Sequence, residues 1–167
     1  MADGPHGLRR APTTYLWGYG DQAPATCFPT ASALSATWDM DLLEEVGSAL
    51  GVESNALGVD LLLGPGINIK RSPLAGRNFE YFSEDPILSG KLGAAYINGV
   101  QSQGVGATAK HYVANNVETQ RMWANSNLDE RTLQEVYMTP FEIAVKEAQP
   151  WSVMACYNRV QGEYGTE

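Results

Sequence analysis

Apolar side chains recur at helical spacing in several segments of the chain. In residues 39–57 they recur at intervals of three, four and seven positions, which predicts an amphipathic helix. Gly58 stands where the C-terminal cap of this helix is expected. A second helix is predicted from residue 85 to about residue 103, because Asp85 suits the N-cap and Pro86 suits the first helical position.

A third helix is predicted to begin at Asp129, with a kink or restart at Thr139 and Pro140. A proline inside a helix lacks an amide hydrogen and clashes with the preceding turn. Short apolar runs between the helices are typical of buried strands. These runs are residues 59–63, 105–109 and 152–156, with a weaker candidate at 31–34.

Strands that alternate with helices predict parallel pairing and therefore an α/β fold. The loops that follow two predicted strands, at residues 64–85 and 110–129, are long and polar, whereas the loops after helices are short. This asymmetry favours part of a TIM-like (β/α)8 barrel, whose functional residues follow the carboxyl ends of the strands. A doubly wound sheet is the alternative. Nucleotide binding is not expected, because Ile69 stands where a dinucleotide-binding loop needs its third glycine.

The composition narrows the class of partner. The 167 residues carry a formal net charge of −8, and 44% of them are hydrophobic, which is enough for a folded core. Nucleic acid is not an expected partner, because phosphate binding needs clustered basic residues. A membrane is not expected either, because the sequence has no apolar run of the ~18 residues that a membrane helix needs.

Two cysteines, Cys27 and Cys156, are too few for a disulfide framework and lack metal-ligand spacing. Their apolar neighbours predict buried free thiols, which together with the lack of a signal segment favours a cytoplasmic location. Turn-like sequence near Asp3 and a loop at residues 162–167 stand at the two ends. We therefore expect the chain to be part of a larger domain.

Residues able to bind a ligand cluster at the predicted carboxyl ends of the strands. They offer a carboxylate, cationic donors and soft or flat apolar surfaces, which suits a polyhydroxylated ligand. The candidates are Asp3, Arg77, Lys110, His111, Met154 and Tyr157.

Each candidate also has a purely structural interpretation. Asp3 could belong to a turn, Arg77 could pair with Glu80 within its loop, and Met154 and Tyr157 could be core residues. Two further features have the same ambiguity. Glu118 and Arg121, three positions apart, are most simply a pair that orders the loop, and Trp17 and Trp123 are either sugar-stacking platforms or packing residues.

Six motifs together resemble glycoside hydrolase family 3, and most closely its bacterial β-glucosidases. Gly76-Arg77-Asn78 and Lys110-His111, in this order, are the most specific of them. The motifs occupy residues 3–9, 64–69, 76–86, 109–112, 129–133 and 154–158. The resemblance implies that residues 1–167 are part of a single N-terminal barrel domain, without the C-terminal α/β sandwich domain of the family. It also implies hydrolysis of terminal non-reducing β-D-glucosides with retention of configuration.

The resemblance assigns a role to each candidate residue. Asp3, Arg77, Lys110 and His111 match residues that bind hydroxyl groups of the glycone, the sugar that is released from the non-reducing end. Met154 and Tyr157 match residues that line the same subsite, and Arg121 is a further candidate for it. The implied partner is a small-molecule β-glucoside or oligosaccharide, and no metal or organic cofactor is implied. The oligomeric state stays open.

The chain departs from the family pattern at the catalytic carboxylates. Retaining hydrolysis needs a nucleophile and an acid/base about 5–5.5 Å apart. The family's nucleophile is an aspartate in a Ser-Asp-Trp-like segment, which we expect downstream of Glu167, and its acid/base comes later still. This chain alone is therefore expected to be inactive. The alternatives are a non-catalytic sugar-binding module and a family member that acts on another β-glycoside, such as an N-acetylglucosaminide or a xyloside.

Overall fold

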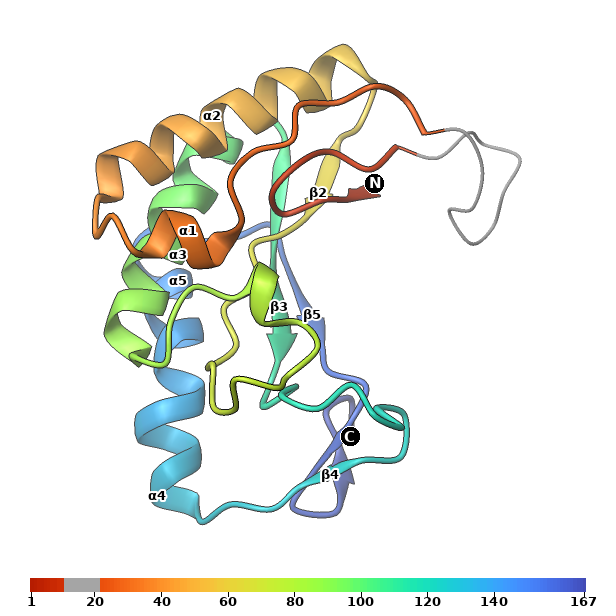
Figure 1. Cartoon of the computed structure of the whole chain (residues 1–167), viewed down its shortest axis with the longest axis vertical. Coiled ribbons are helices and arrows are strands. Elements are labelled where there is room, and N and C mark those ends of the chain that lie inside the picture. Colours follow the sequence, from red (N-terminus) through yellow and green to blue (C-terminus); the bar gives the residue numbers. More distant parts are fainter. Residues whose placement is uncertain (11–21) are drawn as a thin grey trace.

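Four parallel strands form the central sheet of the computed structural model, which describes residues 1–10 and 22–167 (Figure 1). Each strand pairs with the next strand of the sheet in chain order. The strands are β1 (Ala2–Asp3), β2 (Leu61–Leu63), β3 (Gly106–Tyr112) and β5 (Ser152–Ala155). This sequential order is that of an arc of a (β/α)8 barrel, and the sheet shows no switch point of the kind at which the strand order of a doubly wound sheet reverses.

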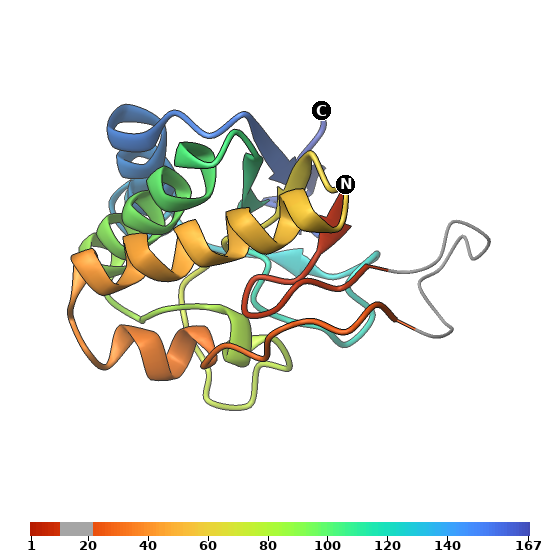
Figure 2. The ribbon, with the colours of Figure 1, turned by 90° about the horizontal axis from the view of Figure 1, so that it is seen from above.

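Three helices cover one face of this sheet (Figure 2). Helix α2 (Met40–Ala56) connects β1 to β2 and packs on α3 (Pro86–Ser102), which connects β2 to β3. Helix α3 packs in turn on α5 (Thr139–Ala148), which precedes β5. The core lies between these helices and the sheet. Its fully buried apolar residues include Leu43, Leu50, Leu62, Leu92, Ile97, Val100 and Ala107.

Aspartate caps begin the three predicted helices and confirm their starts. The carboxylate of Asp39 accepts a hydrogen bond from the amide of Leu42 at 3.0 Å, and Asp85 accepts from Leu88 at 2.8 Å. Asp129 caps a short helix, α4 (Glu130–Thr132), in the same way. Each cap satisfies amide groups that the first helical turn leaves without partners.

The predicted kink at Pro140 is a change of helix type. Helix α4 continues into a π-helical turn, η2 (Leu133–Met138), and α5 begins directly after it. The hydroxyl of Thr139 donates to the carbonyl of Glu135 at 2.8 Å. The hydroxyl thus supplies a hydrogen bond in the turn where the proline has no amide to donate.

The structure differs from the prediction at two of the predicted strands. Residues 31–34 form part of a helix, α1 (Ala31–Ser35), because the side chain of Thr30 caps it and its residues have no β-branched run. Strand β3 does not end at Ala109 but continues through Lys110 and His111 to Tyr112, because it pairs with β5 along this length.

The predicted loops also hold small elements. A 3₁₀ helix, η1 (Asn78–Glu80), lies in the first long loop. A second small sheet joins three short strands from the other loops, in the order β4 (Asn125–Ser126), β6 (Arg159–Val160) and β7 (Glu163–Tyr164). The sheet ties the loop after β3 to the segment after β5. It also corrects the expectation of an unstructured end at residues 162–167.

The two cysteines differ from each other, since Cys156 is buried and Cys27 is exposed. The prediction of two buried thiols is therefore wrong for Cys27, whose segment lies on the surface. Within residues 1–10 and 22–167, no helix is long and apolar enough to cross a membrane.

Glycine lets α2 and α3 approach each other closely. A Cβ atom at Gly99 of α3 would lie 2.1 Å from the carbonyl oxygen of Glu44, and a Cβ atom at Gly47 of α2 would lie 2.4 Å from that of Tyr96. Both distances are far shorter than a carbon–oxygen contact allows. The backbones of the two helices therefore meet at these two positions.

We expect Gly99→Ala to lower the free energy of unfolding by about 1–3 kcal/mol, because the new methyl group must push the two helices apart. Alanine is intrinsically the better helix former by ~1 kcal/mol, so a loss identifies the steric contact as its cause. Asn98→Ala is the matched control, because Asn98 is the exposed neighbour in the same helix. Urea unfolding of both variants measures the difference, and equal stability would contradict the close approach.

Candidate functional site

The candidate residues of the strands lie at one edge of the sheet. Asp3 ends β1, and Lys110 and His111 lie near the end of β3. Met154 of β5 pairs in register with Lys110 and is partly buried. Parallel strands bring their carboxyl ends to the same edge. This is why residues more than a hundred positions apart meet here.

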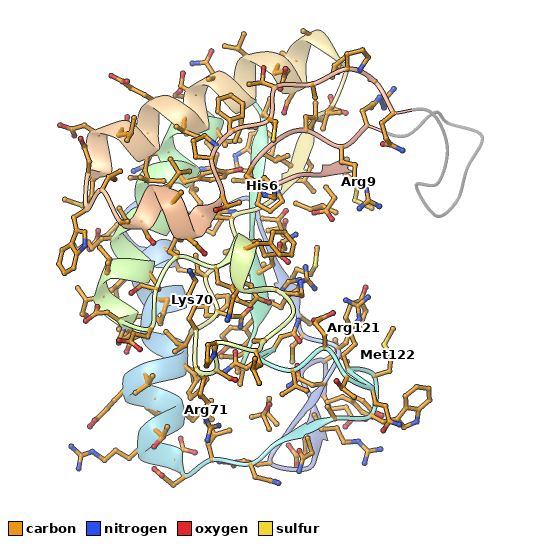
Figure 3. The ribbon with its side chains drawn as sticks, viewed as in Figure 1. His6, Arg9, Lys70, Arg71, Arg121 and Met122 are labelled. Carbon is orange, nitrogen blue, oxygen red and sulfur yellow. The ribbon has the colours of Figure 1, made fainter. Side chains whose placement is uncertain are left out.

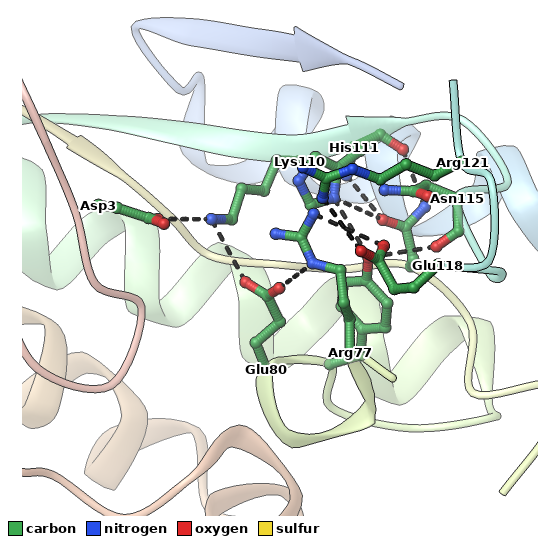
Figure 4. A network of polar contacts seen from close by, with 10 residues as sticks. Asp3, Arg77, Glu80, Lys110, His111, Asn115, Glu118 and Arg121 are labelled. Atoms are coloured by element: carbon green, nitrogen blue, oxygen red, sulfur yellow. Dashed lines mark hydrogen bonds and ion pairs between the residues drawn. The ribbon is translucent and has the colours of Figure 1, made fainter. Parts of the chain in front are cut away.

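Lys110 is the most buried cation of this site. Its side chain is only 2% exposed, and its ammonium group lies 2.8 Å from Oδ1 of Asp3 and 3.3 Å from Oε2 of Glu80 (Figure 4). Removing such a charge from water costs several kcal/mol unless it is paired. The two carboxylates, one from β1 and one from the loop after β2, supply that pairing.

Ion pairs continue from Lys110 across the loops. Glu80 also accepts a hydrogen bond from Nε of Arg77, and Nη1 of Arg77 lies 3.9 Å from Oε1 of Glu118 (Figure 4). Glu118 pairs with Arg121 at 3.0 Å. The guanidinium of Arg121 lies 4.6 Å from the centroid of the Tyr157 ring, within the range of a cation–π contact.

These contacts form a continuous series of ion pairs that ends in the cation–π contact, and we call this series the charge ladder. It runs through Asp3, Lys110, Glu80, Arg77, Glu118, Arg121 and Tyr157. Carboxylates and cations alternate along it. Figure 3 shows Arg121, with its neighbour Met122, on the side of the sheet away from the helices. The charge ladder therefore crosses the carboxyl edge of the sheet from β1 to the segment after β5.

His111 is held by a second set of hydrogen bonds. Its backbone amide donates to Oδ1 of Asn68 at 2.7 Å, and the Asn68 amide group donates back to the His111 carbonyl at 2.8 Å. Its Nδ1 lies 3.2 Å from the Tyr81 hydroxyl and 3.3 Å from Oδ1 of Asn68. The Tyr81 hydroxyl donates its hydrogen to the Asn115 carbonyl. We therefore assign the proton of the imidazole to Nδ1, which leaves Nε2 as an acceptor.

The imidazole of His111 is neutral over the ordinary pH range. Burial, together with the positive charges of Arg77, Lys110 and Arg121, lowers the pKa of His111 to about 2. A neutral imidazole with Nδ1 protonated can accept a hydrogen bond from a ligand hydroxyl through Nε2. Its protonation does not change between pH 5 and pH 8.

The charge ladder also shifts the pKa of two of its members. Burial alone would raise the pKa of Asp3, but the charge and hydrogen bond of Lys110 outweigh it and the pKa falls below its usual value. Burial alone would lower the pKa of Arg77, but Glu80 outweighs it and the pKa rises. Both groups stay charged.

The structure brings together most of the residues that the sequence predicted. All of the candidates lie in the charge ladder or next to Lys110, and the predicted Glu118–Arg121 pair is confirmed. Trp123 is 73% exposed, which excludes it from the core, and Trp17 lies outside the described residues. Sequence reasoning gave Glu80 only as the partner of Arg77. It missed Asn68 and Tyr81, although both lie within the motifs at residues 64–69 and 76–86.

A cavity lies elsewhere, on another part of the molecule. It has a volume of about 720 Å³ and is lined mainly by apolar side chains of η2, α5 and β5, among them Met138, Phe141, Val145 and Val153. Its lining lacks the convergent polar groups that orient a sugar. Within the described ranges, no three His, Cys, Asp or Glu side chains are grouped so that they could hold a metal ion.

Comparison with known proteins decides the family. The model of the glycosyl hydrolase family 3 N-terminal domain matches residues 14–166. The chain belongs to glycosyl hydrolase family 3. Thermostable β-glucosidase B of Acetivibrio thermocellus is 57% identical to this family 3 chain over 168 residues, which cover 100% of the chain and 22% of that relative. An exo-α-(1→6)-L-arabinopyranosidase of Bifidobacterium longum is 46% identical, with 100% of the chain and 22% of the relative covered.

Solved structures of the family show the same fold. The structure of β-glucosidase 3B from Thermotoga neapolitana in complex with glucose superposes with a TM-score of 0.91 at 53% identity, covering 99% of this chain and 23% of that one. A β-glucosidase from Kluyveromyces marxianus gives a TM-score of 0.93 at 43% identity, covering 99% and 19%. The family 3 chain thus spans about a fifth of the length of these relatives.

The neutral state of His111 makes folding depend on pH. Because its pKa is about 2 when folded and ~6.5 when unfolded, the unfolded chain binds the extra proton between these values. The contribution of the neutral His111 imidazole to the free energy of unfolding is therefore fully present above pH 6.5 and is lost as the pH falls below this value. Between pH 7.5 and pH 5.5 it should lower the free energy of unfolding by about 1.4 kcal/mol.

Urea unfolding at the two pH values measures this loss. We expect His111→Asn to remove this part of the pH dependence, whereas His6→Asn, a change of the other histidine, should retain it. The same pH dependence in His111→Asn as in the parent chain would show that His111 is not the group responsible.

Proposed function

We propose that this chain forms the glycone-binding part of a β-glucosidase of family 3. The complete enzyme would hydrolyse terminal non-reducing β-D-glucosides with retention of configuration. The observation that carries the proposal is the charge ladder, in which Lys110 pairs directly with Asp3, and Glu80 links Lys110 to Arg77. The similarity to a β-glucosidase solved with glucose, at 53% identity, supports it.

The charge balance of the site favours an uncharged ligand. Three cations face three carboxylates in the charge ladder, and His111 is neutral. The site therefore has no net charge to attract a phosphate or a carboxylate. Charged donors and acceptors that are already in place instead suit sugar hydroxyls, which both donate and accept hydrogen bonds.

The chemistry would come from other carboxylates. Each carboxylate of the charge ladder is paired with at least one cation, and the pairing leaves none of them placed as a free nucleophile beside a free acid. Retaining hydrolysis needs two such groups ~5–5.5 Å apart. We assign the described residues to binding: they fix the hydroxyl groups, and hydrogen bonds that strengthen in the transition state would contribute several kcal/mol to the rate.

A second substrate class has support of its own. The relative from Bifidobacterium longum, at 46% identity, is named for α-L-arabinopyranoside hydrolysis. An arabinopyranoside ring also carries hydroxyl groups, which are suited to the charged donors and acceptors of the charge ladder. The candidate functions are therefore a β-D-glucosidase and, as the alternative, a glycosidase for another pyranoside such as an arabinopyranoside, a xyloside or an N-acetylglucosaminide.

The test transplants residues 1–167 into β-glucosidase 3B of Thermotoga neapolitana in place of the matching segment. We expect the chimera to hydrolyse 4-nitrophenyl β-D-glucopyranoside. We expect Lys110→Met to lower its kcat/KM by about a hundredfold or more, because the change removes a charged donor and leaves two carboxylates short of a partner. Lys146→Met is the matched control, since Lys146 makes only an exposed pair with Glu142 and should stay within about twofold.

Two results would contradict the proposal. One is a folded chimera that cleaves no glycoside, and the other is a Lys110→Met chimera as active as its parent. Aryl glycosides of the other pyranoses, assayed in parallel, separate the candidate functions. A higher kcat/KM for the α-L-arabinopyranoside would reassign the sugar and keep the glycosidase.

A further inference from the structure

Glu80 is a buried carboxylate that serves two cations at once. Its side chain is 3% exposed. Oε1 accepts the hydrogen bond from Nε of Arg77, and Oε2 lies 3.3 Å from Nζ of Lys110. Each oxygen thus has its own cation. Both oxygens of Glu80 are therefore engaged by cations of the protein, and at 3% exposure neither is open to a ligand.

The backbone, and not the ion pairs alone, places Glu80 beside Lys110. Gly66, in the loop after β2, forms bridges with Lys110 on one side and with Tyr81 on the other. A Cβ atom at Gly66 would lie 2.9 Å from the carbonyl oxygen of Glu80. The segment that carries Glu80 is therefore packed directly against the backbone beside β3, and its carboxylate has little room to move.

Local structure sets the contact with Arg77. Arg77 is the N-cap of η1 and Glu80 is its last residue, and side chains three positions apart eclipse each other in a 3₁₀ helix. Glu80 uses Nε of the guanidinium, the nitrogen nearest the stem. Nη1 lies 3.9 Å from Glu118, beyond hydrogen-bonding distance. The outer end of the guanidinium is thereby available to donate to a ligand.

We propose that Glu80 is a positioning residue that aligns Arg77 and Lys110 for the sugar without touching it. This inference rests on the proposed function. Two like charges held next to each other repel, and the single carboxylate between them offsets that repulsion while fixing the direction of each donor. An amide at this position would keep the shape, but it would present N–H groups to one of the two cations.

The first measurement follows the Nε–H signal of Arg77 by ¹⁵N NMR in the 167-residue chain. In the wild type we expect slow exchange with water, because this hydrogen is bound to a buried carboxylate. Arg131 is the internal reference, since its Nε binds Glu135 at 3.0 Å on the exposed surface. Exchange at Arg77 as fast as at Arg131 would overturn the inference without any variant.

The second measurement is the affinity for glucose, taken as its inhibition constant against the aryl glucoside in the chimera and in its variants. We expect Glu80→Gln to weaken glucose binding by about tenfold or more, because the cations lose their alignment. Glu80→Asp keeps two acceptor oxygens and should recover part of the affinity, which a role in packing alone would not predict. Glu135→Gln, at the exposed pair, should bind as the wild type does.

The outcomes separate this inference from the proposed function. A folded Glu80→Gln variant that binds glucose as tightly as the wild type overturns the positioning role and leaves the proposed function standing. A wild-type chimera that is folded but cleaves no glycoside overturns the proposed function, and with it the role of Glu80 toward the sugar. If Glu80→Gln does not fold, Glu80→Asp decides: affinity equal to that of a Lys110→Met variant contradicts the positioning role.

Discussion

The buried ammonium group of Lys110 is the constraint on which the rest of this structure depends. A lysine that is 2% exposed at the end of a strand is stable only if carboxylates reach it. Asp3 reaches it from β1, and Glu80 reaches it from the loop after β2. The position of one charge therefore requires that a strand and a loop from distant parts of the chain close over the same edge of the sheet.

The requirement extends along the charge ladder. Glu80 is itself buried, and its second oxygen needs Arg77. Glu118 then stands opposite Arg77 and Arg121, so the loop after β3 is drawn to the same edge, where the small sheet β4–β6–β7 also holds it. Fixed dipoles and charges of this kind are in place before a ligand arrives. They bind a polar, uncharged molecule without first having to reorganise.

Local signals in the sequence predicted the helices well, since Asp39, Asp85 and Asp129 are caps whose effect is confined to one turn. Residues 31–34 were mistaken for a strand because a run so short contains almost no periodicity, and the cap at Thr30 decided the outcome. The candidate site was predicted through motifs and strand ends. The link from Glu80 to Lys110 was not, because it depends on the packing of two loops around Gly66 that no local pattern encodes.

Binding and chemistry make opposite demands on a carboxylate, which explains why a site so rich in carboxylates holds none suited to be a nucleophile. Asp3, Glu80 and Glu118 stabilise cations because each shares its charge with a partner. A nucleophile must instead direct an unshared oxygen at the anomeric carbon, and an acid must carry a proton that a nearby cation would displace. A glycosidase built on this edge therefore needs further carboxylates, and the one that carries the proton must lie beyond the reach of Lys110, Arg77 and Arg121.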